Sequence, residues 1–269
     1  MKKFALPALA LMAALAAPLS AQAHRGWMMP SSTILSGESA WVSFDAGASN
    51  GVFIADHAPL RLSATSLVIM APDGTTGAMA NLMQGAYRST FDVHINKPGT
   101  WKVANVSAGM SASYEIAGET RRWRGSAADF ATAIPAGATN VSAQVNNNRL
   151  ETFITLGAPT ETVFAPTGQG LEMVPVTHPN DLVAGEAATF TLLNNGQPAA
   201  DMEVTVARGG LRYRDNPEEM TVRTAADGTF TVTWPEAGMY WVNAARRTEA
   251  AGSAPARSFQ YTAVLEVLP

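Results

Sequence analysis

The sequence contains no cysteine, few charged residues and only four histidines among its 269 residues. The absence of cysteine excludes disulfide bonds, thiolate zinc sites and cysteine nucleophiles. Charged residues make up 15% of the chain and the formal net charge is −4, so no general basic field exists to hold a nucleic acid or an anionic membrane surface. We therefore expect no nucleic-acid partner, and any bound metal must be held by nitrogen, oxygen or thioether sulfur.

Long hydrophobic runs are also missing after residue 23. Residues 1–23 combine two lysines, an apolar stretch and the small-residue motif Ala21-Gln22-Ala23, a pattern typical of a bacterial secretory signal peptide. Cleavage there makes His24 the first residue and leaves 16 basic against 22 acidic residues, a net charge of −6. No later run approaches the roughly 20 apolar residues that a membrane span needs. We predict a periplasmic protein without a membrane span after cleavage.

Proline and glycine are frequent, with 16 and 22 residues, and they separate short segments rich in Val, Thr, Phe and Trp. This pattern predicts an all-β protein of short strands and tight turns. Asn195-Gly196 and Asp227-Gly228 are hairpin signals in the second half. The spacing is typical of two immunoglobulin-like β-sandwich domains in tandem. We expect strands at 40–44, 66–71, 90–95, 101–106, 112–116, 150–156, 186–193, 202–207, 220–224, 229–234, 239–244 and 259–268.

Composition also suggests the domain boundaries. After the signal peptide, residues 24–158 form the expected N-terminal sandwich and residues 171–269 the C-terminal one. The segment between them, 159–170, is rich in proline and glycine and lacks periodicity, so we interpret it as a linker. One short crossover helix is expected at 126–134, where Ser126 can cap the first turn and a proline follows the last.

His24 is the most informative position for function. Export would give it a free α-amine beside its own imidazole, and the two can chelate one metal ion, an arrangement called a histidine brace when a second histidine joins. Both groups bind only when deprotonated, with reference pKa values of about 7.7–8.0 for the amine and about 6.5 for the ring. Nitrogen donors favour copper(II) or nickel(II). The alternative is that His24 is first by coincidence.

Other histidines could complete such a site. Strand alternation places His94 on the same face as Asp92, and His57 follows Asp56, which could orient its ring. The plain alternatives are a solvated strand face for His94 and an exposed ring beside a turn for His57. We take His24, His57 and His94 as candidate metal ligands. His178 precedes a proline and is interpreted as a packing or loop residue.

Signals for catalysis are weak. The sequence has no zinc-protease, serine-hydrolase or phosphate-loop motif, so we assign no catalytic residue and expect a protein that is not an enzyme. The run 119–124 is the strongest local basic cluster. Arginine-rich loops can bind carboxylates or phosphates, but we interpret this one as a solvated edge.

Four segments carry a family resemblance: 24–30 (HRGWMMP), 171–186 (LEMVPVTHPNDLVAGE), 195–204 (NGQPAADMEV) and 227–240 (DGTFTVTWPEAGMY). They resemble an exported bacterial family of unknown function that is associated with nickel and cobalt uptake. The second half is similar to transthyretin-like or carboxypeptidase-regulatory-like sandwiches. The resemblance implies a periplasmic accessory protein for transition metals and, as its partner, an envelope metal transporter.

Three hypotheses follow. The first is a metal-binding accessory protein that uses His24 to handle nickel, cobalt or copper. The second is a copper-dependent oxidase resembling the polysaccharide monooxygenases, which also begin at a mature histidine. The third is an envelope interaction module that binds no metal.

Overall fold

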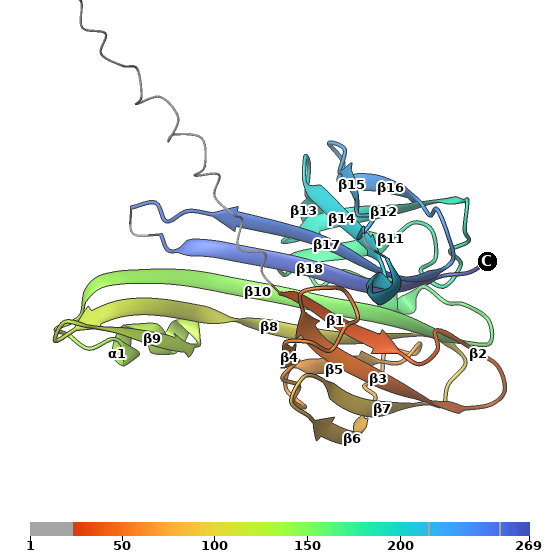
Figure 1. Cartoon of the computed structure of the whole chain (residues 1–269), viewed down its shortest axis with the longest axis horizontal. Helices are drawn as coiled ribbons and strands as arrows, with labels where there is room; N and C mark the ends of the chain where they lie inside the picture. The colour runs from red at the N-terminus through yellow and green to blue at the C-terminus, as the bar shows by residue number, and fades with distance from the viewer. Residues whose placement is uncertain (1–23, 215, 253) are drawn as a thin grey trace, which may run out of the picture.

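The structure, a computed structural model, describes residues 24–214, 216–252 and 254–269, so the predicted signal peptide at 1–23 lies outside the described residues. The strands form three sheets stacked as layers (Figure 1). The described part of the chain has one α-helix, α1 (Ala127–Ala133), and the 3-10 turns η1 (Thr162–Phe164) and η2 (Leu211–Tyr213). None of these described helices has the length and apolar character needed to cross a membrane. The prediction of an all-β chain whose sheets pack face to face is confirmed.

Sheet A, the first layer, consists of β1 (Arg25–Pro30), β3 (Ala40–Ser49), β4 (Ala58–Pro59), β6 (Met79–Gln84) and β7 (Ser89–Ile95). Its order is β1-β3-β7-β6, with β4 also paired to β3, and every pairing is antiparallel. β3 buries Val42, Phe44 and Ala46 and exposes Trp41, the alternation expected of a half-buried strand.

Sheet B is the middle layer and runs through both halves of the chain. In spatial order it contains β15 (Met220–Arg223), β14 (Glu203–Arg208), β17 (Gly238–Thr248), β18 (Ala256–Val267), β10 (Thr139–Leu156), β8 (Gly99–Ile116) and β5 (Leu67–Met70). β2 (Ile34–Leu35) pairs with β10, and β9 (Glu119–Gly125) pairs with β8. β10 and β18 pair in parallel from Gln144 opposite Ala256 to Thr152 opposite Val264. Strand pairing therefore joins the two expected sandwiches through one shared sheet.

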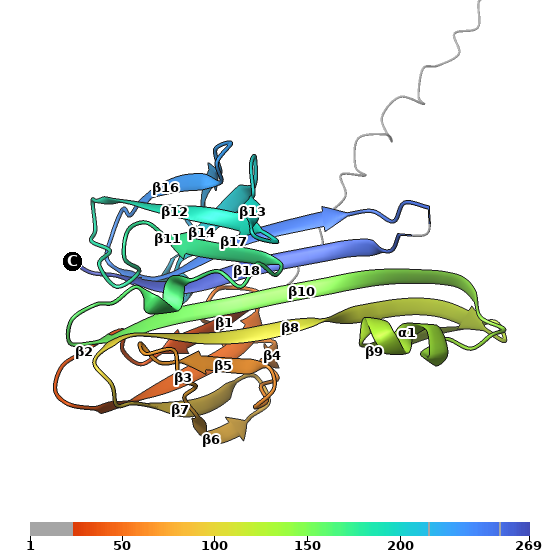
Figure 2. The ribbon, with the colours of Figure 1, turned by 180° about the vertical axis from the view of Figure 1, so that it is seen from behind.

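Sheet C covers the other face of sheet B, as Figure 2 shows from behind. It consists of β11 (Leu171–Pro175), β12 (Ala187–Asn194), β13 (Gln197–Pro198) and β16 (Thr229–Thr233), and β12 pairs with each of the other three. All its strands come from the second half of the chain.

Two hydrophobic cores lie on the two faces of sheet B. Because successive side chains of a strand point to opposite faces, β10 contributes Phe153 to the core against sheet C and Ile154 to the core against sheet A. The core against sheet A also contains Trp241 and Val264, which belong to the second half of the sequence. Each half thus contributes side chains to the core of the other.

β8 and β10 have 18 residues each and continue well beyond sheet A (Figure 1). We call this projecting part the arm. It comprises residues 107–148, which include β9 and α1. The predicted helix lies here. Ser126 accepts a hydrogen bond from the main-chain N–H of Asp129, as expected for its cap, and Phe130 of α1 packs on Trp123 with ring centroids 5.6 Å apart.

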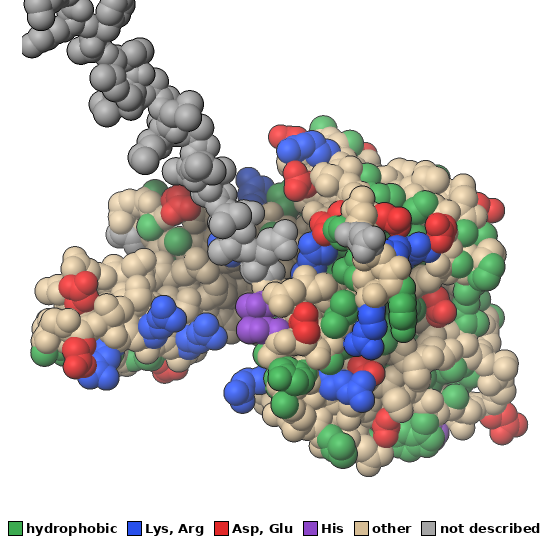
Figure 3. All heavy atoms as spheres, in the orientation of Figure 1, with side chains coloured by type: hydrophobic (Ala, Val, Ile, Leu, Met, Phe, Trp, Pro, Cys, Tyr) green, Lys and Arg blue, Asp and Glu red, His purple; other side chains and the backbone are tan. Residues whose placement is uncertain are grey.

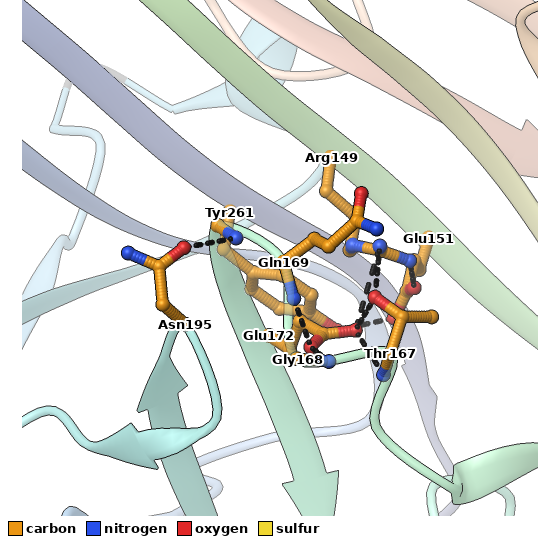
Figure 4. A network of polar contacts seen from close by, with 9 residues as sticks. Arg149, Glu151, Thr167, Gly168, Gln169, Glu172, Asn195 and Tyr261 are labelled. Atoms are coloured by element: carbon orange, nitrogen blue, oxygen red, sulfur yellow. Dashed lines mark hydrogen bonds and ion pairs between the residues drawn. The ribbon is translucent and has the colours of Figure 1, made fainter.

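A buried polar network holds the segment expected to be a linker (Figure 4). Arg149 contacts the carboxylates of Glu151 at 2.9 Å and Glu172 at 3.4 Å, and the Tyr261 hydroxyl donates to Glu151 at 3.0 Å. The main-chain N–H groups of residues 167–169 donate to Glu172. Burial raises the pKa of Glu172, but these hydrogen bonds and Arg149 outweigh it and leave the pKa below its usual value. The linker is therefore packed against β10 rather than free.

Candidate metal site

The N-terminal segment is anchored on β17 of sheet B. The Arg25 guanidinium lies 5.1 Å from the centroid of the Trp241 ring and forms an ion pair with Glu219 at 2.6 Å. The Trp241 indole N–H donates to the main-chain carbonyl of Gly26 at 2.9 Å. These contacts fix the position of His24, which immediately precedes β1.

His24 and His57 lie together. Their imidazole rings are stacked, with centroids 3.4 Å apart and an interplanar angle of 8°. β3 brings them together because β1 pairs with one of its edges, with Arg25 opposite Ser49, and β4 pairs with the other, with Ala58 opposite Ala48. Both histidines are exposed at the surface.

The stack decides what this pair can do chemically. Ligand nitrogens lie about 2 Å from a bound metal, so two nitrogens that share one metal lie within about 4 Å of each other. The two rings are that close, but their lone pairs lie in parallel planes, and a shared metal requires one exposed ring to turn. In the described part of the chain, no three side chains among His, Asp and Glu form a metal-binding group. Among the described side chains, the two imidazoles are thus joined by no third residue of these types.

Among the described residues, Asp56 forms no hydrogen bond with the His57 ring. Its carboxylate instead accepts a hydrogen bond from the main-chain N–H of Asn50 at 3.2 Å. This contact shapes the loop that carries His57 and so helps to place the ring.

His94 lies elsewhere, on the outer face of sheet A. Its ring stacks on Trp41, with centroids 4.7 Å apart, and it pairs across the sheet with Trp41 on β3. Trp41 and Ser49 are eight residues apart on β3, which corresponds to about 26 Å. The structure therefore brings His24 to His57 and leaves His94 at the other end of β3.

Asp92 shares the face of His94, as strand alternation suggested. Its carboxylate accepts hydrogen bonds from Ser43 at 2.6 Å and Asn81 at 2.7 Å, and these lower its pKa. The carboxylate is thus engaged by neutral partners of sheet A.

His178 packs between the two halves. Its Nδ1 accepts from the main-chain N–H of Asn180 at 3.1 Å, its Nε2 lies 3.0 Å from the Thr100 hydroxyl, and its ring contacts Phe164 with centroids 5.2 Å apart. Burial lowers the pKa of His178, which favours the neutral ring. These contacts agree with its interpretation as a packing residue.

Sequence reasoning missed a polar surface on the arm. Gln144, Asn146 and Asn148 alternate along β10 and line one groove with Ser107 and Ser111 of β8. Five of the six residues at 144–149 are polar, and a search for alternating apolar residues does not detect a strand of this kind.

Comparison with known proteins identifies the family. The model of a family described as "Domain of unknown function (DUF4198)" matches residues 21–248, and the chain belongs to this family. No curated protein matches the chain. Among solved structures, the D0-D1 domain of Intimin is 14% identical, with 90% of this chain and 97% of that chain covered and a TM-score of 0.23. The ICAM-5 D1-D4 ectodomain fragment is also 14% identical, with 91% and 51% covered and a TM-score of 0.23. Likenesses this low carry no inference about function.

Proposed function

We propose that this member of the DUF4198 family is a periplasmic transition-metal-binding accessory protein whose ligands are the α-amine and imidazole of a mature N-terminal His24 and the imidazole of His57. The observation that carries the proposal is the stack of the two rings, with centroids 3.4 Å apart. Two imidazole nitrogens and one amine nitrogen suit nickel(II), cobalt(II) or copper(II). The metal is cargo, and the proposal includes no catalytic step.

The α-amine supplies the third donor that side chains lack. In the uncut chain the nitrogen of His24 belongs to a peptide bond, where resonance delocalises its lone pair. Cleavage after residue 23 converts it into an amine that can bind a metal once deprotonated. Removal of the leader would therefore both release the protein into the periplasm and complete the site.

The resemblance to an exported family associated with nickel and cobalt uptake supports the choice of cargo and the choice of partner. We propose an envelope metal transporter as the protein that receives the metal. In this proposal the transthyretin-like second half supports the site, because Trp241 and Glu219 of that half hold Arg25, the neighbour of His24.

The test compares four forms of the protein in competition with a chromophoric chelator for nickel(II), cobalt(II) and copper(II). These are the mature protein that begins at His24, a form with one glycine added before His24, a His57→Gln variant and a His94→Gln variant as matched control. We expect the added glycine and His57→Gln each to weaken binding by about 100-fold, since each removes a ligand or its geometry. His94→Gln should bind like the mature protein.

Affinity should also fall with acidification. Both donor types bind a metal only when deprotonated, so binding should weaken as the pH falls. Equal affinity of the mature and glycine-extended forms would remove the amine from the site. Equal losses for His57→Gln and His94→Gln would remove the ring stack from the argument.

A further inference from the structure

One face of sheet B extends beyond sheet A and stays open. Here β9, β8, β10, β18 and β17 lie side by side. Sheet B packs on sheet A with one of its two faces, and we call the part of this face that extends beyond sheet A the arm face. Its residues follow from strand alternation. Leu150 and Trp241 belong to the core against sheet A, and every second residue beyond them on the same strand points to the same face. The arm face is polar across these strands: Ser107, Ser111, Gln144, Asn146, Asn148, Asn243, Ser258 and Gln260.

The arm face is hollowed in two places. A groove of about 600 Å³ lies over β8 and β10, where the register sets Asn148 opposite Ser107 and Gln144 opposite Ser111. A smaller hollow of about 220 Å³ lies over β17 and β18. Their floors present amide and hydroxyl groups, which both donate and accept hydrogen bonds.

Arginines stand at both edges of the arm face. Arg124 pairs with Ser111 and Arg122 with Ser113 at the β9 edge, and Arg247 pairs with Ser258 at the β17 edge. All three are exposed, and none has a carboxylate partner among the described residues, whereas Arg121 on the opposite face of β9 pairs with Glu119. Figure 3 shows basic side chains along the arm, beyond the histidines at its junction with the body. These three arginines share one face of the strands, although the chain as a whole carries a net charge of −4.

One carboxylate shares this face of β8, at the far end of the arm. Glu115 lies four residues beyond Ser111 and accepts a hydrogen bond from the Asn140 amide at 2.8 Å. It lines neither hollow. The larger groove therefore presents hydrogen-bonding groups and the Arg124 guanidinium, without a carboxylate. The smaller hollow contains one carboxylate, Glu219, which is ion-paired with Arg25, and it also presents Arg247.

We propose that the arm face binds an extended acidic segment of a partner protein. Guanidinium groups bind carboxylates through paired hydrogen bonds, and the amides of the floor match the main-chain groups of an extended peptide. Five strands span about 19 Å from β9 to β17, a width that about six extended residues cross at about 3.3 Å each. A sugar polymer would find no free aromatic ring in either hollow, because Arg25 covers Trp241. The charge and the floor together favour the peptide.

The arm face also reaches the candidate metal site. Arg25, the residue after His24, lines the smaller hollow together with Arg247 and Gln260. A segment bound there would lie beside the N-terminus. The inference itself needs no metal, so it can fail or succeed independently of the proposed function.

The test measures binding of a fluorescent peptide of about eight glutamates to the metal-free protein by fluorescence anisotropy, with chelator present. The face variant is Arg122→Ser with Arg124→Ser. The control variant is Arg121→Ser with Arg246→Ser, which removes the same charge from the opposite face of the same sheet. We expect the face variant to weaken binding by about tenfold or more and the control variant by less than about twofold. Asn146→Ala should also weaken binding, because it removes a floor amide without changing charge.

Two comparisons make the test decisive. Binding should fall as salt rises above about 0.15 M, where the Debye length is about 8 Å, and a matching octaglutamine should bind more weakly. Equal losses of affinity in the face and control variants would mean that only the overall charge of the protein matters for peptide binding, and this would overturn the proposal. Tighter binding of oligogalacturonate than of the glutamate peptide would assign the face to an acidic glycan instead, and absence of peptide binding at low salt would refute it outright.

Discussion

Replacing Arg149 by leucine tests the buried network that ties β10 to the linker. Arg149 is 7% exposed and contacts Glu151 and Glu172, which are 3% and 4% exposed. Lys102, 6% exposed, lines the same small cavity as both glutamates. The network thus balances two buried positive charges against two negative ones. Arg149→Leu leaves the two carboxylates facing one lysine.

The expected cost follows from that imbalance. Removing one partner of a buried ion pair costs about 3–5 kcal/mol, and because Lys102 stays in place we expect the lower end, about 3 kcal/mol at pH 7. The cost should shrink in acid. Glu172 has a lowered pKa in the folded protein, so it contributes stability above its unfolded-state pKa of about 4.3, and this contribution is lost as the pH falls through the folded-state pKa. Arg149 is one of the groups that lower the pKa of Glu172, so the variant lacks this part of the contribution to stability already at pH 7.

Urea unfolding followed by tryptophan fluorescence at pH 7 and at about pH 4 measures both effects. Arg246→Leu, which removes an exposed arginine from β17, serves as the control and should change the free energy of unfolding by less than about 0.5 kcal/mol. A loss below about 1 kcal/mol for Arg149→Leu at pH 7, or an equal loss at both pH values, would refute the reasoning.

Two further predictions concern backbone conformation and pH. Gly228 has φ of +80° and an added Cβ would lie 2.4 Å from the Leu192 carbonyl oxygen, so Gly228→Ala should destabilise the protein by more than Gly185→Ala, where φ is +83° but the space is open. We expect about 1 kcal/mol for the control and about 3 kcal/mol for Gly228→Ala in urea unfolding, and equal losses would contradict the steric argument. Burial lowers the pKa of His178, so its contribution to stability is present above about pH 6.5 and lost as the pH falls below that value. A His178→Gln variant should show a shallower loss of stability between about pH 7 and pH 5, and an unchanged slope would assign that loss to other groups.

Local patterns in the sequence located most of the strands. The expected strand at 90–95 lies within β7, the one at 229–234 overlaps β16, and the capped helix at 126–134 contains α1. These elements have clear apolar alternation or a capping residue, which act within a few residues. The segments at 101–106 and 112–116 were expected as separate strands but belong to the single strand β8, which continues through residues 107–111.

The sequence by itself determined the all-β class, the short helix and the set of four histidines from which a site could be built, because periodicity, turn residues and composition are local properties. Tertiary structure alone decided which histidine lies beside His24: β3 carries β1 and β4 on its two edges, and so selects His57, while His94 faces Trp41 at the far end of the same strand. It also decided that β10 pairs with β18 and that the polar residues of the arm share one face. Pairing between strands more than a hundred residues apart depends on how both cores pack, and no local pattern encodes it.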